Sequence, residues 1–431
     1  MMKNFIREGK WAKMNRIDEL IREYCPDGVE IRYLEDCCNL LDKKRKPITK
    51  AFREAGEYPY YGANGIQDYV ANYIFDGTYV LVGEDGSVIT KEGTPVVTWA
   101  KGKIWVNNHA HIIEEKEGVM LRYLYHYLQT IDVTSLIHGN IPKLTGGDFK
   151  ALKIAVPPLE VQREIVRVLD SFTLLTAELT AELTARKKQY NFYRDKLLTF
   201  GKDTLNCRLK EICDICLGLT ATPNYTDAGV KFISAQNTSN DFLDLNNVKY
   251  ISEADFEKAT SNAKPQKGDL LFTRVGSNLG HPVVVETDED LCIFVSLGFL
   301  RIRNKEQVII GYLKHWMNTD LFWSQVRKNV HGAAKVNLNT GWLKEFNISL
   351  PPLETQERIV HVLDNFESIC TDLNIGLPAE IEARQKQYEY YRDLLLTFAE
   401  KGNTIMTDRQ TDRQTDRQTD RQTDRQTDRQ S

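Results

Sequence analysis

The sequence predicts an α+β protein in which one unit, a globular segment followed by a long helix, occurs twice. A sixteen-residue block that begins at Pro157 returns 194 positions later at Pro351, with eleven identical residues. A second sixteen-residue block, which begins at Ala185, returns at Ala383 with twelve identical residues. Repeats of this kind mark two copies of one structural unit. The chain is therefore organised as globular segment, helix, globular segment, helix.

The repeated blocks predict long helices at residues 157–200 and 351–398. Each opens with two prolines, which the first turn of a helix tolerates because their missing N–H groups have no intrahelical partner there. Apolar residues then recur at spacings of three and four, as in the seam of a coiled coil. The predicted seam residues are Ile165, Leu169, Phe172, Leu179, Leu183, Ile359, Leu363, Phe366 and Leu373. We expect the two stripes to pair with each other; the alternative is two helices buried in separate domains.

These landmarks divide the chain into parts. Residues 1–28 form an N-terminal extension and a short amphipathic helix, and the globular segments span residues 29–156 and 205–350. The second long helix is expected to break near 376–378, where the sequence reads Gly-Leu-Pro. Residues 399–431 form a tail.

Short strands and one helix are expected in each globular segment. The first segment has predicted strands at Tyr79–Val82, Pro95–Trp99 and Lys103–Val106, separated by glycine-containing turns, and a helix at Leu121–Thr130. The second has predicted strands at Asp269–Thr273 and Pro282–Val285 and a helix near Ile310–Lys328. The two segments begin and end alike and differ in between. This pattern suggests two modules on one frame that bind two different things.

Composition is that of a soluble cytoplasmic protein. The formal net charge is −4, so any contact with nucleic acid must be local. There is no apolar run long enough for a transmembrane helix and no secretory signal. The eight cysteines are scattered, and a single Cys213-x-x-Cys216 pair without further ligands favours buried reduced thiols over zinc.

A search for catalytic motifs finds no phosphate-binding loop and no metal-binding HExxH helix. Glu114-Glu115-Lys116 has the spacing of a nuclease motif but lies in a charged turn without a convincing upstream aspartate. His109 and His111 would share one face of a strand, yet no third metal ligand is near, so surface or core histidines are favoured. The sequence therefore predicts no catalytic residue and no metal site.

The repeated motifs carry a family resemblance. The paired PPLExQxxIVxVLDxF and ARxKQYxxYRDxLLTF blocks, and the opening RIDELIREYCPDGVE, resemble the specificity subunit of type I restriction–modification systems from Met14 to Phe398. The resemblance implies two target recognition domains, separated by two helices that pair as an antiparallel coiled coil. Each domain would read one half of a bipartite double-stranded DNA target.

The same resemblance implies partners. Two modification subunits, which bind S-adenosylmethionine and methylate adenine, would dock on this chain, and restriction subunits would add ATP- and Mg-dependent translocation and cleavage. The chain itself would bind no cofactor and catalyse nothing. Two other functions stay open: a free-standing bivalent DNA-binding protein and a scaffold for two protein ligands.

Candidate DNA contacts are the polar and basic residues in loops of the two segments. In the first segment they are Lys43, Lys44, Arg45, Lys46, Asn64 and Lys143, and in the second Gln236, Asn237, Arg274, Ser277, Asn278, Lys335 and Asn337. A basic run such as 43–46 is often only a solvated face. Arg274 is the strongest candidate, because an arginine binds guanine or phosphate bidentately and Gly276 allows close approach. The alternative is that residues 274–278 form an ordinary hairpin.

Two short tandem repeats complete the sequence. Thr-Ala-Glu-Leu occurs twice in succession at 176–183, inside the first predicted helix, and a change in its number should change the spacing between half-sites. The alternative is a repeat in a helix without functional consequence. Thr-Asp-Arg-Gln occurs six times from Thr407 to Gln430 and has no apolar residue, so disorder is expected. The codons ACA GAC AGA CAG would make this tail a slippage-prone tetranucleotide repeat; the rival interpretation is a solvated interaction tail.

Overall fold

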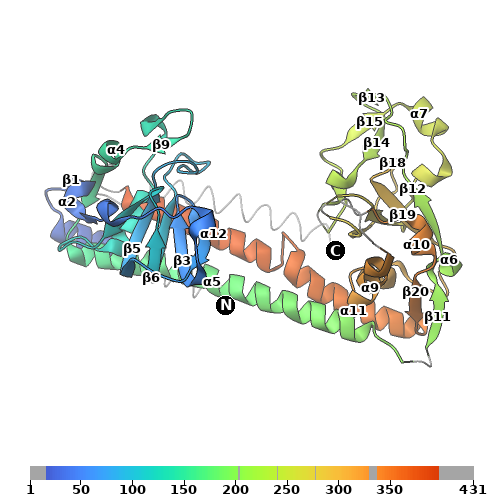
Figure 1. Cartoon of the computed structure of the whole chain (residues 1–431). Coiled ribbons are helices and arrows are strands. Elements are labelled where there is room, and N and C mark those ends of the chain that lie inside the picture. Colours follow the sequence, from blue (N-terminus) through green and yellow to red (C-terminus); the bar gives the residue numbers. More distant parts are fainter. Residues whose placement is uncertain (1–15, 202–203, 240, 277, 330–336, 398–431) are drawn as a thin grey trace. The chain divides into compact units, whose positions relative to one another are not determined.

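A computed structural model describes residues 16–201, 204–239, 241–276, 278–329 and 337–397. The described residues divide into two compact units: unit 1 contains those up to 177 and those from 383 to 397, and unit 2 contains those from 178 to 382. Figure 1 shows the strands and helices of each unit. The N-terminal extension, the Thr-Asp-Arg-Gln tail, Ser277 and Lys335 lie outside the described residues. No helix in the described ranges is both long and apolar enough to cross a membrane.

The first long helix is α5, Leu159–Leu197, and it is continuous. Its first half belongs to unit 1, where Phe172 stacks on Tyr391 of α12, Leu377–Leu396, with ring centroids 5.2 Å apart. Its second half belongs to unit 2, where Tyr193 stacks on Phe366 of α11, Leu353–Thr371, at 5.9 Å. We call α5 the first arm, and α11 together with α12 the second arm. The start of the first arm contacts the end of the second arm, and the end of the first contacts the start of the second, which confirms that the two arms pair antiparallel.

The seam residues are not all buried in the same way. Ile165 and Leu169 are fully buried in the core of unit 1, and Leu363 is fully buried in the core of unit 2 with Ile359 beside it. Leu179 and Leu183, in the tandem repeat, are only partly buried. The arms therefore serve two purposes, since they pair with each other and also complete the core of each globular segment.

The predicted position of Leu373 in the seam is wrong, because the second arm is interrupted earlier than expected. Helix α11 ends before Asp372, whose Oδ1 accepts from the backbone N–H groups of Asn374 and Ile375 at 2.6 and 3.1 Å. This side chain turns the backbone away from the helix, and it leaves Leu373 60% exposed. Pro378 lies in the first turn of α12, where a proline is tolerated. It is therefore not Pro378 that ends α11.

The two arms differ in length by one tandem unit. The first repeated block recurs after 194 positions and the second after 198, so the second arm holds four residues more between its blocks. One Thr-Ala-Glu-Leu unit has four residues. The second arm carries its excess within the non-helical residues 372–376, opposite a first arm that is helical throughout.

Unit 1 contains a six-stranded sheet in the order β2-β7-β5-β6-β3-β4. The strands are β2 Asn39–Leu40, β3 Ala55–Gly62, β4 Gly65–Val70, β5 Phe75–Gly83, β6 Val97–Val106 and β7 Ala110–Glu114. Neighbours are antiparallel except β3 and β6. The prediction of separate strands at Pro95–Trp99 and Lys103–Val106 is wrong. Residues 97–99 and 103–106 both lie in β6, and Gly102, at φ +86°, stays in the ladder opposite Gly77.

The rest of unit 1 forms a frame that joins the sheet to α5. Strand β1, Glu30–Tyr33, pairs with β10, Lys153–Val156, and leads into the short helix α2, Leu34–Cys37. Helix α3, Leu121–Leu128, covers most of the helix predicted at Leu121–Thr130 and packs against α5. The smaller elements are β8 Ile137–His138, β9 Lys143–Leu144, α4 Gly146–Lys150 and a helix at residues 16–24.

Unit 2 has the same frame around a different insert. Strand β11, Leu205–Arg208, pairs with β20, Asn347–Leu350, and leads into α6, Leu209–Ile212. One sheet has the order β12-β19-β16-β17 and another β13-β15-β14-β18. Their strands are β12 Cys213–Leu217, β13 Tyr225–Thr226, β14 Val230–Ile233, β15 Lys249–Ile251, β16 Leu270–Thr273, β17 Pro282–Val284, β18 Leu291–Ile293 and β19 Leu297–Ile302. Helices α7 Glu253–Lys258 and α10 Thr340–Lys344 complete the unit.

The single helix predicted near Ile310–Lys328 is two helices, α8 Ile310–Met317 and α9 Asp320–Asn329. Thr319 separates them, because its hydroxyl donates to the carbonyl of Trp316 at 2.6 Å and accepts from the N–H of Phe322 at 3.2 Å. The Thr319 side chain therefore ends α8 and caps the start of α9. The two cysteines of the CxxC pair lie on β12 and pack into different clusters, so they cannot share a metal ion.

A buried glutamine explains the PPLExQ motif in both units. In unit 1, Gln162 is fully buried; it accepts from the N–H of Met120 at 2.9 Å and donates to the carbonyls of Pro157 and Gly118 at 2.7 and 3.0 Å. In unit 2, Gln356 makes the same three bonds to Ile309, Pro351 and Gln307. Each glutamine ties the start of its long helix to the strand and loop that precede it.

A second repeated network links each frame to the opposite arm. In unit 1, His126 of α3 lies between Tyr388 and Asp170, with Nδ1 2.8 Å from the tyrosine hydroxyl and Nε2 2.9 Å from the carboxylate. In unit 2, His315 lies in the same way between Tyr190 and Asp364, at 3.1 and 2.8 Å. Each tyrosine comes from the repeated block of the other copy. Each unit is therefore assembled from parts of both repeats.

We expect unit 1 to lose stability as its buried histidine becomes protonated. Nε2 of His126 faces the Asp170 carboxylate, which only accepts, so Nε2 carries a hydrogen. Burial lowers the pKa of the ring and so favours its neutral form, in which Nδ1 accepts from the hydroxyl of Tyr388. Below the ordinary value of about 6.5 the unfolded state binds more protons, so stability falls with pH until the lowered pKa is passed. The urea midpoint of unit 1 should therefore drop more between about pH 7.5 and about pH 5.5 in the wild type than in His126→Gln. His138→Gln, on an exposed histidine of unit 1, is the control; equal slopes in wild type and His126→Gln would contradict this expectation.

Candidate nucleic-acid interface

Arg45 of the predicted basic run is a structural anchor. Its guanidinium pairs with Glu84 and donates to the carbonyl of Ala110 at 2.8 Å, and its Nε donates to the carbonyl of Asp42 at 2.9 Å. Only 14% of the side chain is exposed. Arg45 therefore fixes the loop at residues 42–53, which we call the basic loop, to the sheet beside it.

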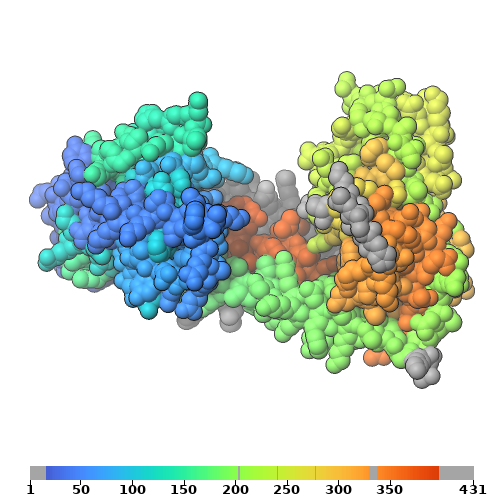
Figure 2. Space-filling view, in the orientation of Figure 1, coloured from blue at the N-terminus to red at the C-terminus, as the bar shows by residue number. Residues whose placement is uncertain are grey.

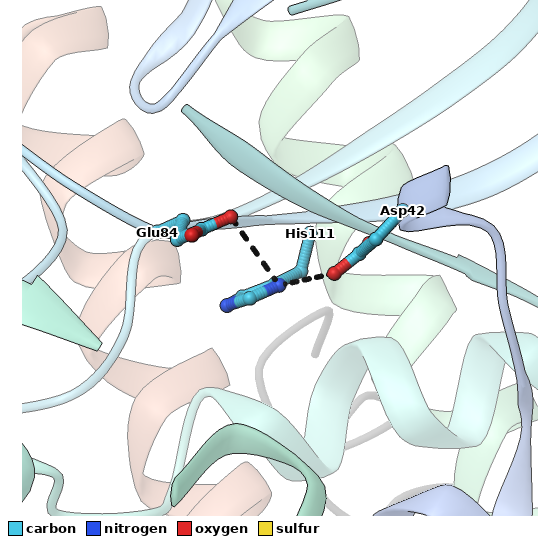
Figure 3. A group of neighbouring side chains, drawn as sticks. All are labelled: Asp42, Glu84 and His111. Carbon is cyan, nitrogen blue, oxygen red and sulfur yellow. Dashed lines mark hydrogen bonds and ion pairs between the residues drawn. The ribbon is translucent and has the colours of Figure 1, made fainter. Parts of the chain in front are cut away.

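The anchor continues through the three residues in Figure 3, Asp42, Glu84 and His111. Nδ1 of His111 lies 2.6 Å from Asp42 and 3.8 Å from Glu84, and its Nε2 lies 3.2 Å from the carbonyl of Leu144. The ring is almost fully buried and stacks on Phe149 at 4.2 Å. Burial acts to raise the pKa of Asp42, but the bonds from His111 and from the N–H of Ile112 outweigh it and hold that pKa below its usual range.

This cluster has the ligand types of a cation site, but its charges are already balanced. Glu84 pairs with Arg45 and with Lys143, whose Nζ lies 3.3 Å away, and Arg45 lies 3.6 Å from Asp42. Two cationic side chains next to two carboxylates disfavour a divalent ion, because they occupy the oxygens that would bind it. The network thus fixes the basic loop to β5, β7 and β9.

The other end of the basic loop is also fastened. The indole of Trp105 donates to the carbonyl of Lys46 at 2.6 Å, and the Tyr60 hydroxyl accepts from the N–H of Ile48 at 3.0 Å. Arg53 donates to the carbonyl of Ile48 at 3.1 Å, pairs with Asp68 at 3.2 Å and lies over the Tyr60 ring. The backbone of the loop is held at several points, so its outward side chains have fixed starting positions.

The remaining candidates of unit 1 fall into two groups. Lys43, Lys44 and Lys46 are exposed on the basic loop, and Asn64 is exposed in the tight turn between β3 and β4. Lys143 is 45% exposed but is paired with Glu84. The N-terminal, blue part of the chain covers much of the visible face of unit 1 in Figure 2. The exposed lysines and Asn64 are accessible to a ligand, and Arg45 holds the loop that carries the lysines.

In unit 2, Arg274 lacks a counter-ion among the described residues. Its Nη1 donates to the carbonyl of Val295 at 2.9 Å, while its Nε is buried and has no hydrogen-bond partner within the described part of the chain. Burial lowers the pKa of the guanidinium. A buried N–H without an acceptor costs about 1–3 kcal/mol. Gly276, at φ +120°, follows in the same loop.

The other candidates of unit 2 differ in exposure. Gln236 and Asn337 are exposed, and Asn278 is partly buried with its amide 3.3 Å from the carbonyl of Ser239. Asn237 is 6% exposed; it accepts from the N–H of Ser234 at 3.0 Å and donates to the carbonyl of Asn247 at 2.9 Å. Asn237 thus holds its own loop together.

Sequence reasoning missed several of these features. It did not single out Phe52 in the basic loop, although an isolated phenylalanine between charged residues was a visible signal. It also missed the short motif Tyr-Leu-x-His, present at 123–126 and 312–315, which supplies the two buried histidines. Comparison of the two copies at that spacing would have found it.

Comparisons with known proteins agree with this architecture. The family model described as type I restriction modification DNA specificity domain matches twice, at residues 26–186 and 202–383. The chain belongs to the type I restriction–modification specificity subunit family. Each match contains one globular segment and at least the first part of the long helix that follows it.

The relatives of this specificity subunit span most of its length. A Haemophilus influenzae protein named as the putative type I restriction enzyme specificity subunit S.HindORF215P is 36% identical over 385 residues, which are 86% of this chain and 96% of that one. The EcoR124I/EcoR124II specificity subunit of Escherichia coli is 31% identical over 294 residues, 65% of this chain and 71% of that one. Specificity subunits are the recognition subunits of these systems and are not catalytic, in accord with the absence of catalytic motifs in this sequence.

Solved structures share the fold. The S subunit of a type I system from M. genitalium has a TM-score of 0.51 at 14% identity and covers 85% of this chain and 96% of its own. A second structure, from work on complex assembly and conformational transition of the type I R-M system, has the same TM-score at 17% identity and covers 88% of this chain. Two specificity domains and paired long helices are thus confirmed as the architecture of this protein.

Proposed function

We propose that this specificity subunit reads a bipartite double-stranded DNA target, one half-site with each unit, and holds two modification subunits and the restriction subunits on the same DNA. The observation that carries the proposal is the repeated frame. The buried glutamine and the His–Tyr–Asp network are the same in both units, whereas the inserted sheets differ in strand number and order. A common frame suits two copies of one partner, and unlike inserts suit two different half-sites.

The proposed DNA contacts divide by type. The exposed lysines of the basic loop would contact phosphates, which position a protein on the duplex without reading its sequence. Asn64, Gln236, Asn278 and Asn337 have the amide groups that read base edges, adenine above all. S-adenosylmethionine, ATP and Mg²⁺ would be bound by the partner subunits, and the assembly would act in the cytoplasm, where the cell's DNA lies.

Copurification with a modification subunit tests this proposal against its rivals. The chain and the modification subunit should form one complex, and the complex should bind target duplex with an affinity that falls steeply as salt rises. A regulator that acts alone would bind with full affinity and specificity without the modification subunit. A protein scaffold would show no salt-dependent affinity for DNA, and that result would refute the proposal.

Replacement of Arg274 should broaden one half-site. Loss of a bidentate arginine contact costs about 1–3 kcal/mol and relaxes the base at that position. Arg274→Ala should therefore make one position of one half-site degenerate in a methylation map and leave the other half-site unchanged. Arg303→Ala, which removes an exposed arginine paired with Asp214 in the same unit, should change neither. An unchanged motif in Arg274→Ala would show that Arg274 reads no base.

A further inference from the structure

The basic loop presents one large apolar side chain to solvent. Phe52 is 84% exposed, and among the large apolar side chains of the described residues only Ile375 is more exposed. Exposed apolar residues are common, but a phenylalanine at this exposure contributes little to the core. It lies on the loop that also carries four exposed lysines, at 43, 44, 46 and 50.

The position of Phe52 is fixed by the backbone around it. Residues Lys50–Phe52 form a short 3-10 turn, in which the N–H of Phe52 donates to the carbonyl of Thr49 at 2.9 Å. The next residue, Arg53, is held by Ile48, Asp68 and the Tyr60 ring. The backbone that carries Phe52 is therefore held in place by these contacts.

The charges beside Phe52 point to a polyanion. Lys50 is exposed in the same turn, and Lys43, Lys44 and Lys46 are exposed earlier in the loop. Within residues 42–53 the one acidic residue is Asp42, and its carboxylate is bonded to His111 and to the N–H of Ile112. Four exposed lysines on one loop of a chain whose net charge is −4 form a local basic surface.

We infer that Phe52 is a base-contacting residue of unit 1, which packs against base edges in a groove while the lysines around it hold the phosphates. This inference rests on the proposed function and adds a residue that discriminates sequence. Lysine–phosphate contacts are the same on every sequence, whereas an apolar contact with a thymine methyl or an opened base step depends on the bases. Because the backbone at Phe52 is already held, such a contact requires only the side chain to be ordered.

The test uses the complex of this chain with its modification subunit, a duplex that contains the mapped target and an unrelated duplex of equal length. Phe52→Ala should weaken target binding about tenfold and binding to the unrelated duplex less than about twofold, with no change in salt dependence because no charge is lost. Lys50→Ala should weaken binding to both duplexes and reduce the salt slope by about one. Phe52→Leu should keep most of the target affinity. Tyr33→Ala, which removes a 51% exposed aromatic on β1, is the matched control and should change nothing.

The possible failures are distinct. Target affinity that is unchanged in Phe52→Ala, or an equal loss on both duplexes, would overturn the inference, since Phe52 would then read no base. Loss of the modification subunit from the Phe52→Ala complex would also overturn it and identify Phe52 as a protein contact. If the unmodified complex does not prefer the target duplex at all, the proposed function itself fails, whatever Phe52 does.

Discussion

A chain with a third Thr-Ala-Glu-Leu unit inserted after Leu183 is expected to direct methylation to the same two half-sites with a longer gap between them. The insert lengthens α5 by about 6 Å and rotates the part of the helix beyond it by about 40°. Because DNA rises about 3.4 Å per base pair, the gap should grow by one or two base pairs. The two half-sites should keep their bases, since no residue of either insert is changed.

The structure explains why the chain should accept this insert. The existing tandem, at 176–183, contains the boundary between unit 1 and unit 2, and its leucines are only partly buried. The second arm already holds four more residues than the first between the repeated blocks and carries them without a regular helix at 372–376. Because residues 372–376 are not helical, the second arm can lengthen there when the first arm becomes longer.

Methylation mapping of the three-unit variant checks this expectation. A variant with Thr180→Ala and Glu182→Gln, which changes the tandem but keeps its length, is the control and should keep the original gap. Altered bases in either half-site of the three-unit variant would mean that the tandem takes part in recognition. An unchanged gap would mean that the first arm does not set the spacing.

Replacement of the buried glutamine is expected to destabilise each frame strongly. Gln162→Leu would leave the N–H of Met120 and the carbonyls of Pro157 and Gly118 without their partner. Buried groups left in this way cost about 1–3 kcal/mol each, so unit 1 should lose about 3 kcal/mol or more. Gln356→Leu should have an effect of similar size on unit 2, because it removes the same three bonds.

Urea unfolding followed by hydrogen-exchange mass spectrometry measures each unit separately. Peptides that cover α3 should lose protection at lower urea in Gln162→Leu, while peptides that cover α8 should not, and Gln356→Leu should show the reverse. Gln189→Leu, at an exposed position of α5, is the control and should stay within about 0.5 kcal/mol of wild type. A Gln162→Leu chain as stable as wild type would show that the PPLExQ glutamine is not structural.

The sequence was informative where a repeated pattern reflects a single physical cause. The prolines at 157 and 351 and the stripe through Leu169 and Leu363 predicted both long helices, because helix entry and apolar spacing are local properties. Leu373 was misplaced in the seam because the helix ends at Asp372, whose side chain competes for the backbone N–H groups. Spacing alone does not reveal that competition.

Contacts between distant residues could not be read in the same way. His126 meets Tyr388, 262 positions away, because each unit takes its second arm from the other repeat. Within the basic run, Arg45 is an anchor and Lys43 is exposed, a distinction that depends on Glu84 and on the sheet behind it. The sequence therefore located the basic loop as a candidate site but could not assign a role to each of its residues.

The central claim is that two unlike units each recognise one part of a divided target. Single-molecule methylome sequencing of cells that express this chain with its modification subunit tests that claim most directly. The predicted result is methylated adenine in one motif of two different half-sites separated by a fixed number of unspecified bases. A single uninterrupted motif, or two half-sites found at many spacings, would contradict it.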